Sequence, residues 1–179
     1  NDGDLDIFHV NGFDAAFVDP KFLDDQVRYF ESQGDGTFVE RATAMGLTST
    51  GQGRGVACFD ADRDGDIDIY VSNNEHLVDS DNFYVNNLST DNHYLAVRLR
   101  DCGLNTACLG ARIELSANGT TQIREIRAGS NFVSQNPAEA HFGLGSASVV
   151  DLAIRWPDGS RSEFAAIGVD RLLELSPAP

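Results

Sequence analysis

Residues 60–68 place a carboxylate at every second position of a short, glycine-containing segment. The segment reads Asp-Ala-Asp-Arg-Asp-Gly-Asp-Ile-Asp, so five aspartates occupy positions 1, 3, 5, 7 and 9: Asp60, Asp62, Asp64, Asp66 and Asp68. Calcium prefers six to eight oxygen ligands in a flexible geometry. Alternate residues of a tight turn can direct such oxygens inward, so the spacing predicts a calcium site.

Gly65 permits the sharp bend that such a loop needs, because glycine adopts backbone conformations that other residues avoid. Without a cation the five carboxylates repel one another, and we therefore expect the ion to be part of the fold. We predict side-chain ligands and one backbone carbonyl, with water completing the shell. The side chains are those of Asp60, Asp62, Asp64 and Asp68, and the carbonyl is that of Asp66.

Two other interpretations of this loop fit less well. An EF-hand needs a bidentate glutamate at position 12 and a helix on either side, whereas position 12 is Val71 and both flanks have strand patterns. Magnesium demands stricter octahedral geometry and retains its waters, so calcium is favoured.

The loop has a partial copy at the start of the chain. Residues 1–8, Asn-Asp-Gly-Asp-Leu-Asp-Ile-Phe, recur as residues 63–70, Arg-Asp-Gly-Asp-Ile-Asp-Ile-Tyr. Aligning Gly3 with Gly65 gives Asp2, Asp4 and Asp6 positions 5, 7 and 9, and positions 1 and 3 fall before Asn1. We expect a fragment of a longer protein, in which the first loop binds calcium only when the preceding residues are present.

Short strands are predicted around both loops. Residues 27–31 and 37–41 flank a glycine-rich turn at 33–36, which is typical of a hairpin. Residues 55–59 form an apolar run that enters the second loop, and residues 67–71 leave it with the period of two of a half-buried strand. A repeat near sixty residues with this content favours β-propeller blades.

The pattern changes near residue 91. Alternating apolar and polar residues predict five short strands, at 94–100, 111–115, 122–127, 149–156 and 172–175. No helix pattern accompanies them, which favours a small β-sandwich or barrel. We therefore predict an all-β chain, with partial propeller blades and calcium loops over residues 1–91 and a second β domain over 92–179.

The net charge of −15 is unevenly distributed. Residues 1–91 carry 19 of the 28 acidic and 5 of the 13 basic residues, a net charge of −14, and residues 92–179 carry −1. Such an acidic half attracts cations and repels nucleic acids and anionic membranes, so we expect no nucleic-acid partner. No run of eighteen apolar residues occurs, so we expect no membrane insertion.

Cys102 and Cys108 bracket a short stretch with the composition of a loop. A disulfide between them would contribute roughly 2 kcal/mol and would fit an oxidising compartment, and the alternative is two free thiols. Cys58 lies in an apolar run and is predicted to be a buried, unreactive thiol.

The first half resembles the FG-GAP/VCBS calcium-loop repeat, through its aspartate loops and through Gly-Asp-Gly-Thr-Phe at 34–38 and Gly-Arg-Gly-Val at 53–56. The second half resembles the ASPIC/UnbV domain of cartilage-acidic-protein-like sequences. That resemblance is carried by residues 110–112, 122–125, 129–130, 134–135, 141–145 and 155–159. The resemblance implies an extracellular protein, secreted or on the cell surface, with a propeller and a C-terminal β domain and no established catalytic residues.

An enzyme would need a nucleophile with a base, a pair of acid/base carboxylates or a catalytic metal. No sequence pattern pairs a serine or cysteine with any of the four histidines, His9, His76, His93 and His141, and His141 is expected to make a structural hydrogen bond. We predict a non-catalytic adhesion or recognition module that binds a protein or a glycan. The alternative is a structural subunit of an extracellular assembly or filament, bound to copies of itself.

Arginines of the second half could form an anion or glycan patch, although the simpler interpretation is scattered solubilising charge. The candidates are Arg98, Arg100, Arg112, Arg124, Arg127 and Arg155.

Overall fold

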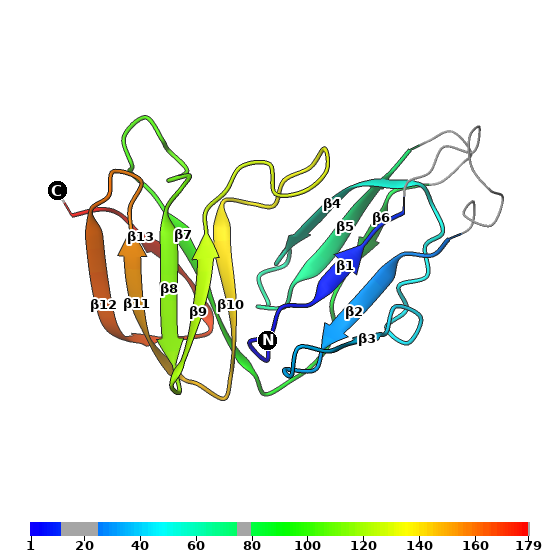
Figure 1. Cartoon of the computed structure of the whole chain (residues 1–179), viewed down its shortest axis with the longest axis horizontal. Helices are drawn as coiled ribbons and strands as arrows, with labels where there is room; N and C mark the ends of the chain where they lie inside the picture. Colours follow the sequence, from blue (N-terminus) through cyan, green and yellow to red (C-terminus); the bar gives the residue numbers. More distant parts are fainter. Residues whose placement is uncertain (12–24, 75–79, 179) are drawn as a thin grey trace.

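The structure is a computed structural model that describes residues 1–11, 25–74 and 80–178. Within these residues the chain forms thirteen β-strands in four small sheets and no helix. Figure 1 shows two groups of strands side by side, with the N-terminal residue between them. The all-β prediction is confirmed.

The first group contains two three-stranded antiparallel sheets with the orders β1-β2-β3 and β4-β5-β6. The predicted hairpin at 33–36 joins β2 to β3, and the aspartate loop joins β4 to β5. Their bounds are β1 Ile7–His9, β2 Arg28–Ser32, β3 Phe38–Glu40, β4 Gly53–Phe59, β5 Asp68–Asn73 and β6 Asn82–Tyr84.

The two sheets repeat one arrangement. Ile7 of β1 lies opposite Phe30 of β2, and Ile69 of β5 lies opposite Tyr84 of β6. Ile7 and Ile69 are 62 residues apart, the same offset as the two acidic loops. The strand that leaves each acidic loop therefore pairs in the same way with the next strand along the chain.

The second group contains two sheets around one core, with the orders β10-β7-β13 and β12-β11-β8-β9. All pairs are antiparallel except β13 with β7, which is parallel. Their bounds are β7 His93–Leu99, β8 Arg112–Ala117, β9 Thr120–Glu125, β10 Glu139–Gly145, β11 Val149–Arg155, β12 Arg161–Gly168 and β13 Arg171–Leu175.

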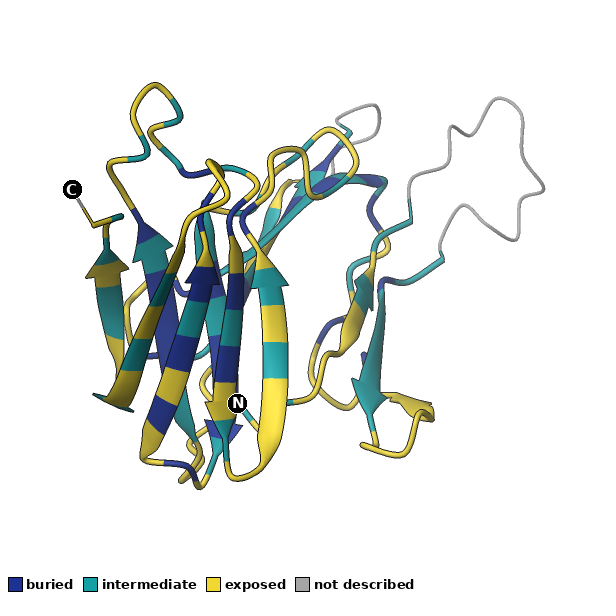
Figure 2. Ribbon diagram, turned by 60° about the vertical axis from the view of Figure 1, so that its left-hand side comes forward, coloured by how far each residue is buried: buried dark blue, intermediate teal, exposed yellow. Residues whose placement is uncertain are grey.

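The core of the second group is built from alternate residues of both sheets. Leu95 and Phe142 from one sheet and Ile113 and Ile154 from the other are fully buried in a single hydrophobic cluster. Figure 2 shows buried and exposed residues alternating along these strands. This period of two directs one face of each sheet inward and leaves the other face to solvent.

Two strands of this group escaped prediction from the sequence. β10 includes the Gly143 and Gly145 positions of a glycine-rich motif, and glycine has low strand propensity. β12 has the sequence Arg-Ser-Glu-Phe-Ala-Ala-Ile-Gly, in which two adjacent alanines break the alternation. Pairing with β7 and β11 supplies the hydrogen bonds that define these strands.

A two-residue turn at Asn118 and Gly119 joins β8 to β9. Both residues have positive φ, 49° and 79°, as a type I′ hairpin turn requires. Asparagine and glycine tolerate this conformation best, so these residue types suit the hairpin that they form.

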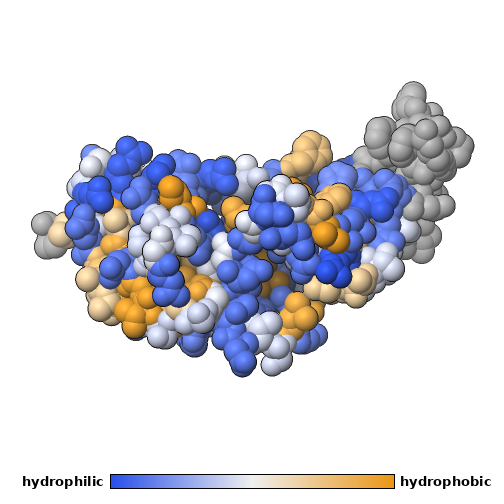
Figure 3. Space-filling model, turned by 60° about the horizontal axis from the view of Figure 1, so that its bottom comes forward, coloured by the Kyte–Doolittle hydropathy of each residue, from blue (hydrophilic) through white to orange (hydrophobic). Residues whose placement is uncertain are grey.

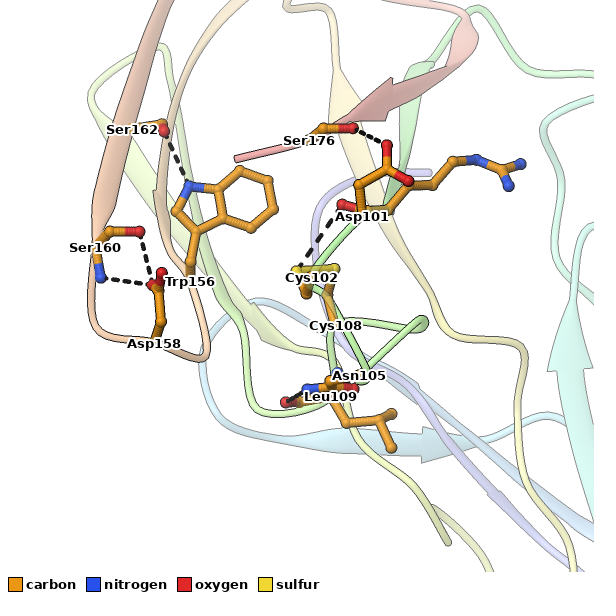
Figure 4. Close-up of a disulfide and its surroundings, with 11 residues drawn as sticks. Asp101, Cys102, Asn105, Cys108, Leu109, Trp156, Asp158, Ser160, Ser162 and Ser176 are labelled. Carbon is orange, nitrogen blue, oxygen red and sulfur yellow. Dashed lines mark hydrogen bonds between the residues drawn. A yellow bond between two sulfur atoms is a disulfide. The ribbon is translucent and has the colours of Figure 1, made fainter. Parts of the chain in front are cut away.

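The structure joins Cys102 and Cys108 in a disulfide, with their Cα atoms 5.3 Å apart. Cys108 is fully buried and belongs to the core, whereas Cys102 packs against it from the edge. Figure 4 shows the small loop that this bond closes, held also by Asn105, whose side chain makes hydrogen bonds of 2.8 and 2.9 Å with the backbone of Leu109. The bond ties this loop to the hydrophobic core.

The loop before β10 covers the outer edge of β4. The Ser134 hydroxyl accepts a hydrogen bond of 3.0 Å from the Val56 amide and donates one of 2.8 Å to the Val56 carbonyl. The Cys58 amide donates to the side-chain oxygen of Asn136 at 3.0 Å. Side chains of the second group thus occupy backbone groups that an edge strand would leave open.

The surface is largely polar. Figure 3 shows one face of the molecule on which hydrophilic residues surround separate apolar patches. Phe132 and Val133 are 72% and 75% exposed at the tip of the loop that covers β4, and Phe83 of β6 is 50% exposed. Among the described residues no helix reaches the length and apolarity needed to cross a membrane.

Reduction of the disulfide should destabilise the folded protein by about 2 kcal/mol, because the bond restricts the unfolded chain. Thermal melts with and without a thiol reductant measure the effect. The double variant Cys102→Ala/Cys108→Ala is the control, and its melting temperature should not respond to reductant. A wild-type melt that is unchanged after complete reduction would contradict this expectation.

Candidate metal centre

The β4–β5 hairpin brings the two ends of the aspartate loop together. Phe59 and Asp68 are paired across the two strands, so position 9 of the loop lies beside position 1. Carboxylate oxygens of Asp60, Asp62 and Asp68 all lie within 4.8 Å of one another. Three of the four predicted side-chain ligands therefore converge on one place.

One carboxylate oxygen at this place has no hydrogen-bond partner. Asp60 is 6% exposed, and its Oδ2 accepts a hydrogen bond of 3.2 Å from the Gly65 amide. Its Oδ1 is buried and accepts none from the residues that the structure describes. A buried anionic oxygen without a partner is unfavourable, and a cation among the three carboxylates would satisfy it. The donor set consists of oxygens, which fits calcium.

Asp68 is held from two sides. It is 1% exposed, and its carboxylate accepts hydrogen bonds from the Ala61 amide at 2.9 Å and the Asn86 amide at 2.8 Å. The alternation predicted for residues 67–71 differs here, since Asp68 is buried and Ile67 and Ile69 are only half-buried. Its two hydrogen bonds explain why a charged residue occupies an inward position.

Asp64 and Asp66 lie outside the three-carboxylate cluster. The Asp64 carboxylate accepts a hydrogen bond of 2.9 Å from the Asp66 amide, and the Asp66 carboxylate accepts one of 2.8 Å from the Asn1 side chain. Burial raises the pKa of Asp60 and that of Asp66, and the charge of Asp64 raises both further. Asp66 was expected to offer its backbone carbonyl rather than its side chain, and its side chain is engaged elsewhere.

The first acidic loop makes different contacts. The Asp2 carboxylate accepts a hydrogen bond of 3.1 Å from the Asp4 amide, and the Asp6 carboxylate accepts 2.8 Å bonds from the Tyr29 hydroxyl and the Ser32 amide. Burial and the bond to Asp6 raise the pKa of Tyr29. Within the described part of the chain, Asp2, Asp4 and Asp6 do not form a group like the one in the second loop.

One hydrogen bond nevertheless occurs at the equivalent position of both loops. Phe30 and Tyr84 occupy equivalent positions, because they pair with Ile7 and Ile69. Ser32 lies two residues after Phe30, and Asn86 lies two residues after Tyr84. Asp6 and Asp68 each accept the amide hydrogen of that residue at 2.8 Å. The last aspartate of each loop therefore fixes the loop to the end of β2 or to the residues just after β6.

The outer side of the second loop packs against the other half of the chain. Gly65 has a φ of +97°, and a Cβ atom built on it would lie 2.1 Å from Cε1 of Tyr94. The Tyr94 ring stacks on His141, with ring centroids 5.7 Å apart and planes 7° apart. Gly65 is thus required both by the bend of the loop and by the aromatic ring that covers it.

Polar contacts join the same two surfaces. Arg63 and Glu139 form an ion pair of 2.9 Å, and Glu139 also binds Arg98 at 2.7 Å. Asn1 donates to the Gly65 carbonyl at 2.9 Å, and its side-chain oxygen lies 2.8 Å from Nε2 of His141. The hydrogen bond predicted for His141 is therefore present. The roles of Asn1 and Tyr94 had no local signal in the sequence.

An open, polar cleft of about 820 Å³ lies beside this junction. Its lining combines the outer carboxylates of the loop with the segment that leads into β7. The residues are Asn1, Asp64, Asp66, Asn87, Leu88, Ser89, Thr90, Asp91, Asn92, His93, Tyr94 and Asp170.

The described histidines and the free cysteine show no pairing of a base with a nucleophile. His93 binds Asp170 at 2.8 Å and His141 binds Asn1, whereas His76 lies outside the described residues. Cys58 is half-buried rather than fully buried, and burial raises the pKa of its thiol. A raised pKa leaves little of the reactive thiolate near neutral pH.

Two family models match the chain. Residues 1–71 match the FG-GAP-like repeat, and residues 102–179 match ASPIC and UnbV. The resemblance of each half is thereby confirmed: the chain carries an FG-GAP-like repeat followed by an ASPIC and UnbV domain.

The chain is also distantly similar to vertebrate proteins named cartilage acidic protein 1. It is 28% identical to the Homo sapiens protein over 161 residues, which cover 89% of this chain and 24% of that protein. For the Mus musculus protein the identity is 29% over 146 residues, 79% of this chain and 22% of the relative. For the Xenopus tropicalis protein the identity is 30% over 110 residues, which cover 61% of this chain and 17% of that protein. The chain thus spans less than a quarter of the length of these relatives.

Substitution of Gly65 should be more damaging than substitution of another glycine with positive φ. We expect Gly65→Ala to destabilise the protein by more than about 2 kcal/mol, because backbone strain adds to the clash with Tyr94. Gly36→Ala is the matched control: its φ is +87° and nothing lies within 4 Å, so only strain of about 1 kcal/mol remains. Denaturant unfolding measures both. Equal losses would show that the Tyr94 contact does not constrain position 65.

His141 should make stability depend on pH. Burial is the main reason that the pKa of His141 is lowered from 6.5 to about 4. Below pH 6.5 the unfolded state binds a proton that the folded state does not, so stability is lost as the pH falls toward 4, by up to about 3 kcal/mol. Unfolding free energies of wild type and His141→Gln at pH 7, 6 and 5 measure the effect. The variant should lose less stability on acidification, and parallel curves would contradict the assignment.

Proposed function

We propose that this chain, which combines an FG-GAP-like repeat with an ASPIC and UnbV domain, is a calcium-stabilised, non-catalytic recognition module that works outside the cell. One observation carries the calcium part of this proposal. Asp60, Asp62 and Asp68 converge within 4.8 Å, and a buried oxygen of Asp60 has no partner among the described residues. Oxygen donors of this kind suit calcium.

The proposed role of calcium is to hold two surfaces in a fixed relation. The inner side of the aspartate loop carries the three convergent carboxylates, and its outer side contacts Tyr94 and Glu139 of the second half. A cation that orders the loop would also order Gly65 and Arg63, which make those contacts. An ordered surface loses less conformational freedom when it binds a partner, so more of the interaction energy remains as affinity.

We also propose a fold for each half of the chain. The sheets β1-β2-β3 and β4-β5-β6 are proposed as parts of adjacent propeller blades, supported by the FG-GAP-like match and by the repeated strand register. The two sheets of the second half, which share one core, are proposed as a β-sandwich.

The extracellular location is supported by two observations. The structure contains a disulfide between Cys102 and Cys108, and disulfides persist in oxidising compartments. The chain is also similar to cartilage acidic protein 1. The proposed partner is a protein or a glycan.

A second candidate function is a structural subunit that binds copies of itself. The outer edge of β6 pairs with no strand in the described part of the chain, and Phe83 beside it is 50% exposed. An open strand edge is a ready site for association. Size-exclusion chromatography with and without calcium separates the two: calcium-dependent polymers support the subunit, and a monomer in calcium supports the module.

Calcium should stabilise the protein through the second loop. At a free concentration one hundredfold above the dissociation constant, binding adds about 2.7 kcal/mol to the free energy of unfolding. Removal with EDTA should lower the melting temperature, and Asp60→Asn should abolish most of this response. The control Asp91→Asn removes one exposed acidic charge outside the cluster and should respond as wild type does.

Elemental analysis of the purified protein completes the test. It should find calcium in wild type and in Asp91→Asn, and a reduced content in Asp60→Asn. An ion trapped against EDTA would be visible in this measurement. A melt unaffected by EDTA together with the absence of bound calcium would exclude the proposed site.

A further inference from the structure

Three arginines form a continuous row across the outer face of the four-stranded sheet in the second half. Arg155 of β11 lies directly opposite Arg112 of β8 on one side and opposite Arg161 of β12 on the other. The order β12-β11-β8 is visible in Figure 1. Directly opposed residues of neighbouring antiparallel strands have Cβ atoms about 5 Å apart, so like charges there repel one another.

The next row of the same face neutralises only the two outer arginines. Arg112 binds Glu114 at 3.0 Å, and Arg161 binds Glu163 at 3.2 Å. The residue between these glutamates is Ala153, which is paired with both of them and has no group that accepts a hydrogen bond.

Arg155 consequently has no counter-charge of its own. Its side chain makes no ion pair and no hydrogen bond with the residues that the structure describes, and it is exposed. It borders a groove of about 360 Å³, whose walls are Arg112, Glu114, Ala153, Arg155, Gly159 and Arg161. Three guanidinium groups and one carboxylate line this groove. Glu163 beside Arg161 and Glu125, which lies opposite Arg112 on β9, belong to the same face, so Arg155 is the one arginine of the row without a carboxylate partner among the described residues.

Three of the other arginines considered from the sequence have partners, whereas Arg127 is exposed, lies outside the row and, like Arg155, has no partner among the described residues. Arg98 and Arg100 both bind Glu174 from β13. Arg124 lies 5.1 Å from the centroid of the Phe142 ring and donates to the His141 carbonyl at 3.2 Å. Of the six arginines considered from the sequence, Arg112 and Arg155 lie in the row, and its third member, Arg161, was not among the six.

The geometry points to an oxyanion-binding site centred on Arg155, which accepts a sulfate group, either as the free ion or as a sulfate ester of an acidic polysaccharide. A guanidinium presents paired N–H donors that match the oxygens of such a group, and a charge-assisted pair of this kind is stronger than a neutral hydrogen bond. A bound anion would also relieve the repulsion within the row. The groove lies in the second half, whose net charge is −1, and not in the acidic first half.

This inference deepens the proposed recognition function by naming a class of partner, and it rests on that function for its biological setting. Binding at this face does not use the aspartate loop. The test is therefore carried out at saturating calcium, so that a failure of the oxyanion site is distinguishable from a failure of the calcium site.

Two probes test the site: a fluorescent heparin octasaccharide, followed by anisotropy at low ionic strength, and inorganic sulfate, followed by amide NMR shifts of β8, β11 and β12. Arg155→Gln should weaken octasaccharide binding by about tenfold, because a charged hydrogen-bonding group is lost. Ala153→Glu should weaken it to a similar extent by supplying Arg155 with a carboxylate partner. Both positions lie on the outer face, and melts verify that the variants are folded.

Arg127→Gln is the matched control. It removes one exposed positive charge outside the row and should change binding by less than twofold. Shifts with inorganic sulfate that are lost in Arg155→Gln would support the free ion as ligand, and binding of the octasaccharide alone would support the polysaccharide. Equal losses in Arg155→Gln and Arg127→Gln, binding of neither probe, or preference for a polyglutamate peptide over both would overturn the proposal.

Discussion

The convergence of three carboxylates at the end of the β4–β5 hairpin is the constraint on which the rest of the structure depends. Asp60 and Asp68 are almost entirely removed from water, and each charge buried in this way needs a partner. Backbone amides satisfy Asp68 on both oxygens, whereas one oxygen of Asp60 is left for another partner. The loop is therefore shaped by backbone bonds, and it leaves one buried oxygen that a cation would satisfy.

The same nine residues also form part of the junction between the two halves. Because Gly65 has no side chain, the Tyr94 ring can lie against the backbone at the sharpest part of the bend. Arg63 extends from the same turn to Glu139, and Asn1 connects the first acidic loop with the second. On the opposite side, Ser134 and Asn136 bind the edge of β4. Local order in the loop and the arrangement of the halves are consequently coupled.

The uneven charge of the chain corresponds to two different surface chemistries. The first half concentrates carboxylates in loops between strands, where alternate residues can face one ion. In the second half, charges lie on the outer faces of sheets, where cross-strand pairing decides which of them are neutralised. Arg98 and Arg100 bind Glu174, whereas Arg155 lies between Arg112 and Arg161. The net charge of a half therefore does not show which of its charged side chains have a partner.

The sequence by itself determined what depends on neighbouring residues: the all-β class, the hairpin turns, the acidic repeat and the spacing of ligands in residues 60–68. These follow from local periodicity and from the backbone freedom of glycine and asparagine. Only the tertiary structure decided which carboxylates converge, that Tyr94 covers Gly65, and that Arg161 joins Arg112 and Arg155. These contacts join residues distant in sequence, and strand register, which sets them, depends on packing of the whole sheet.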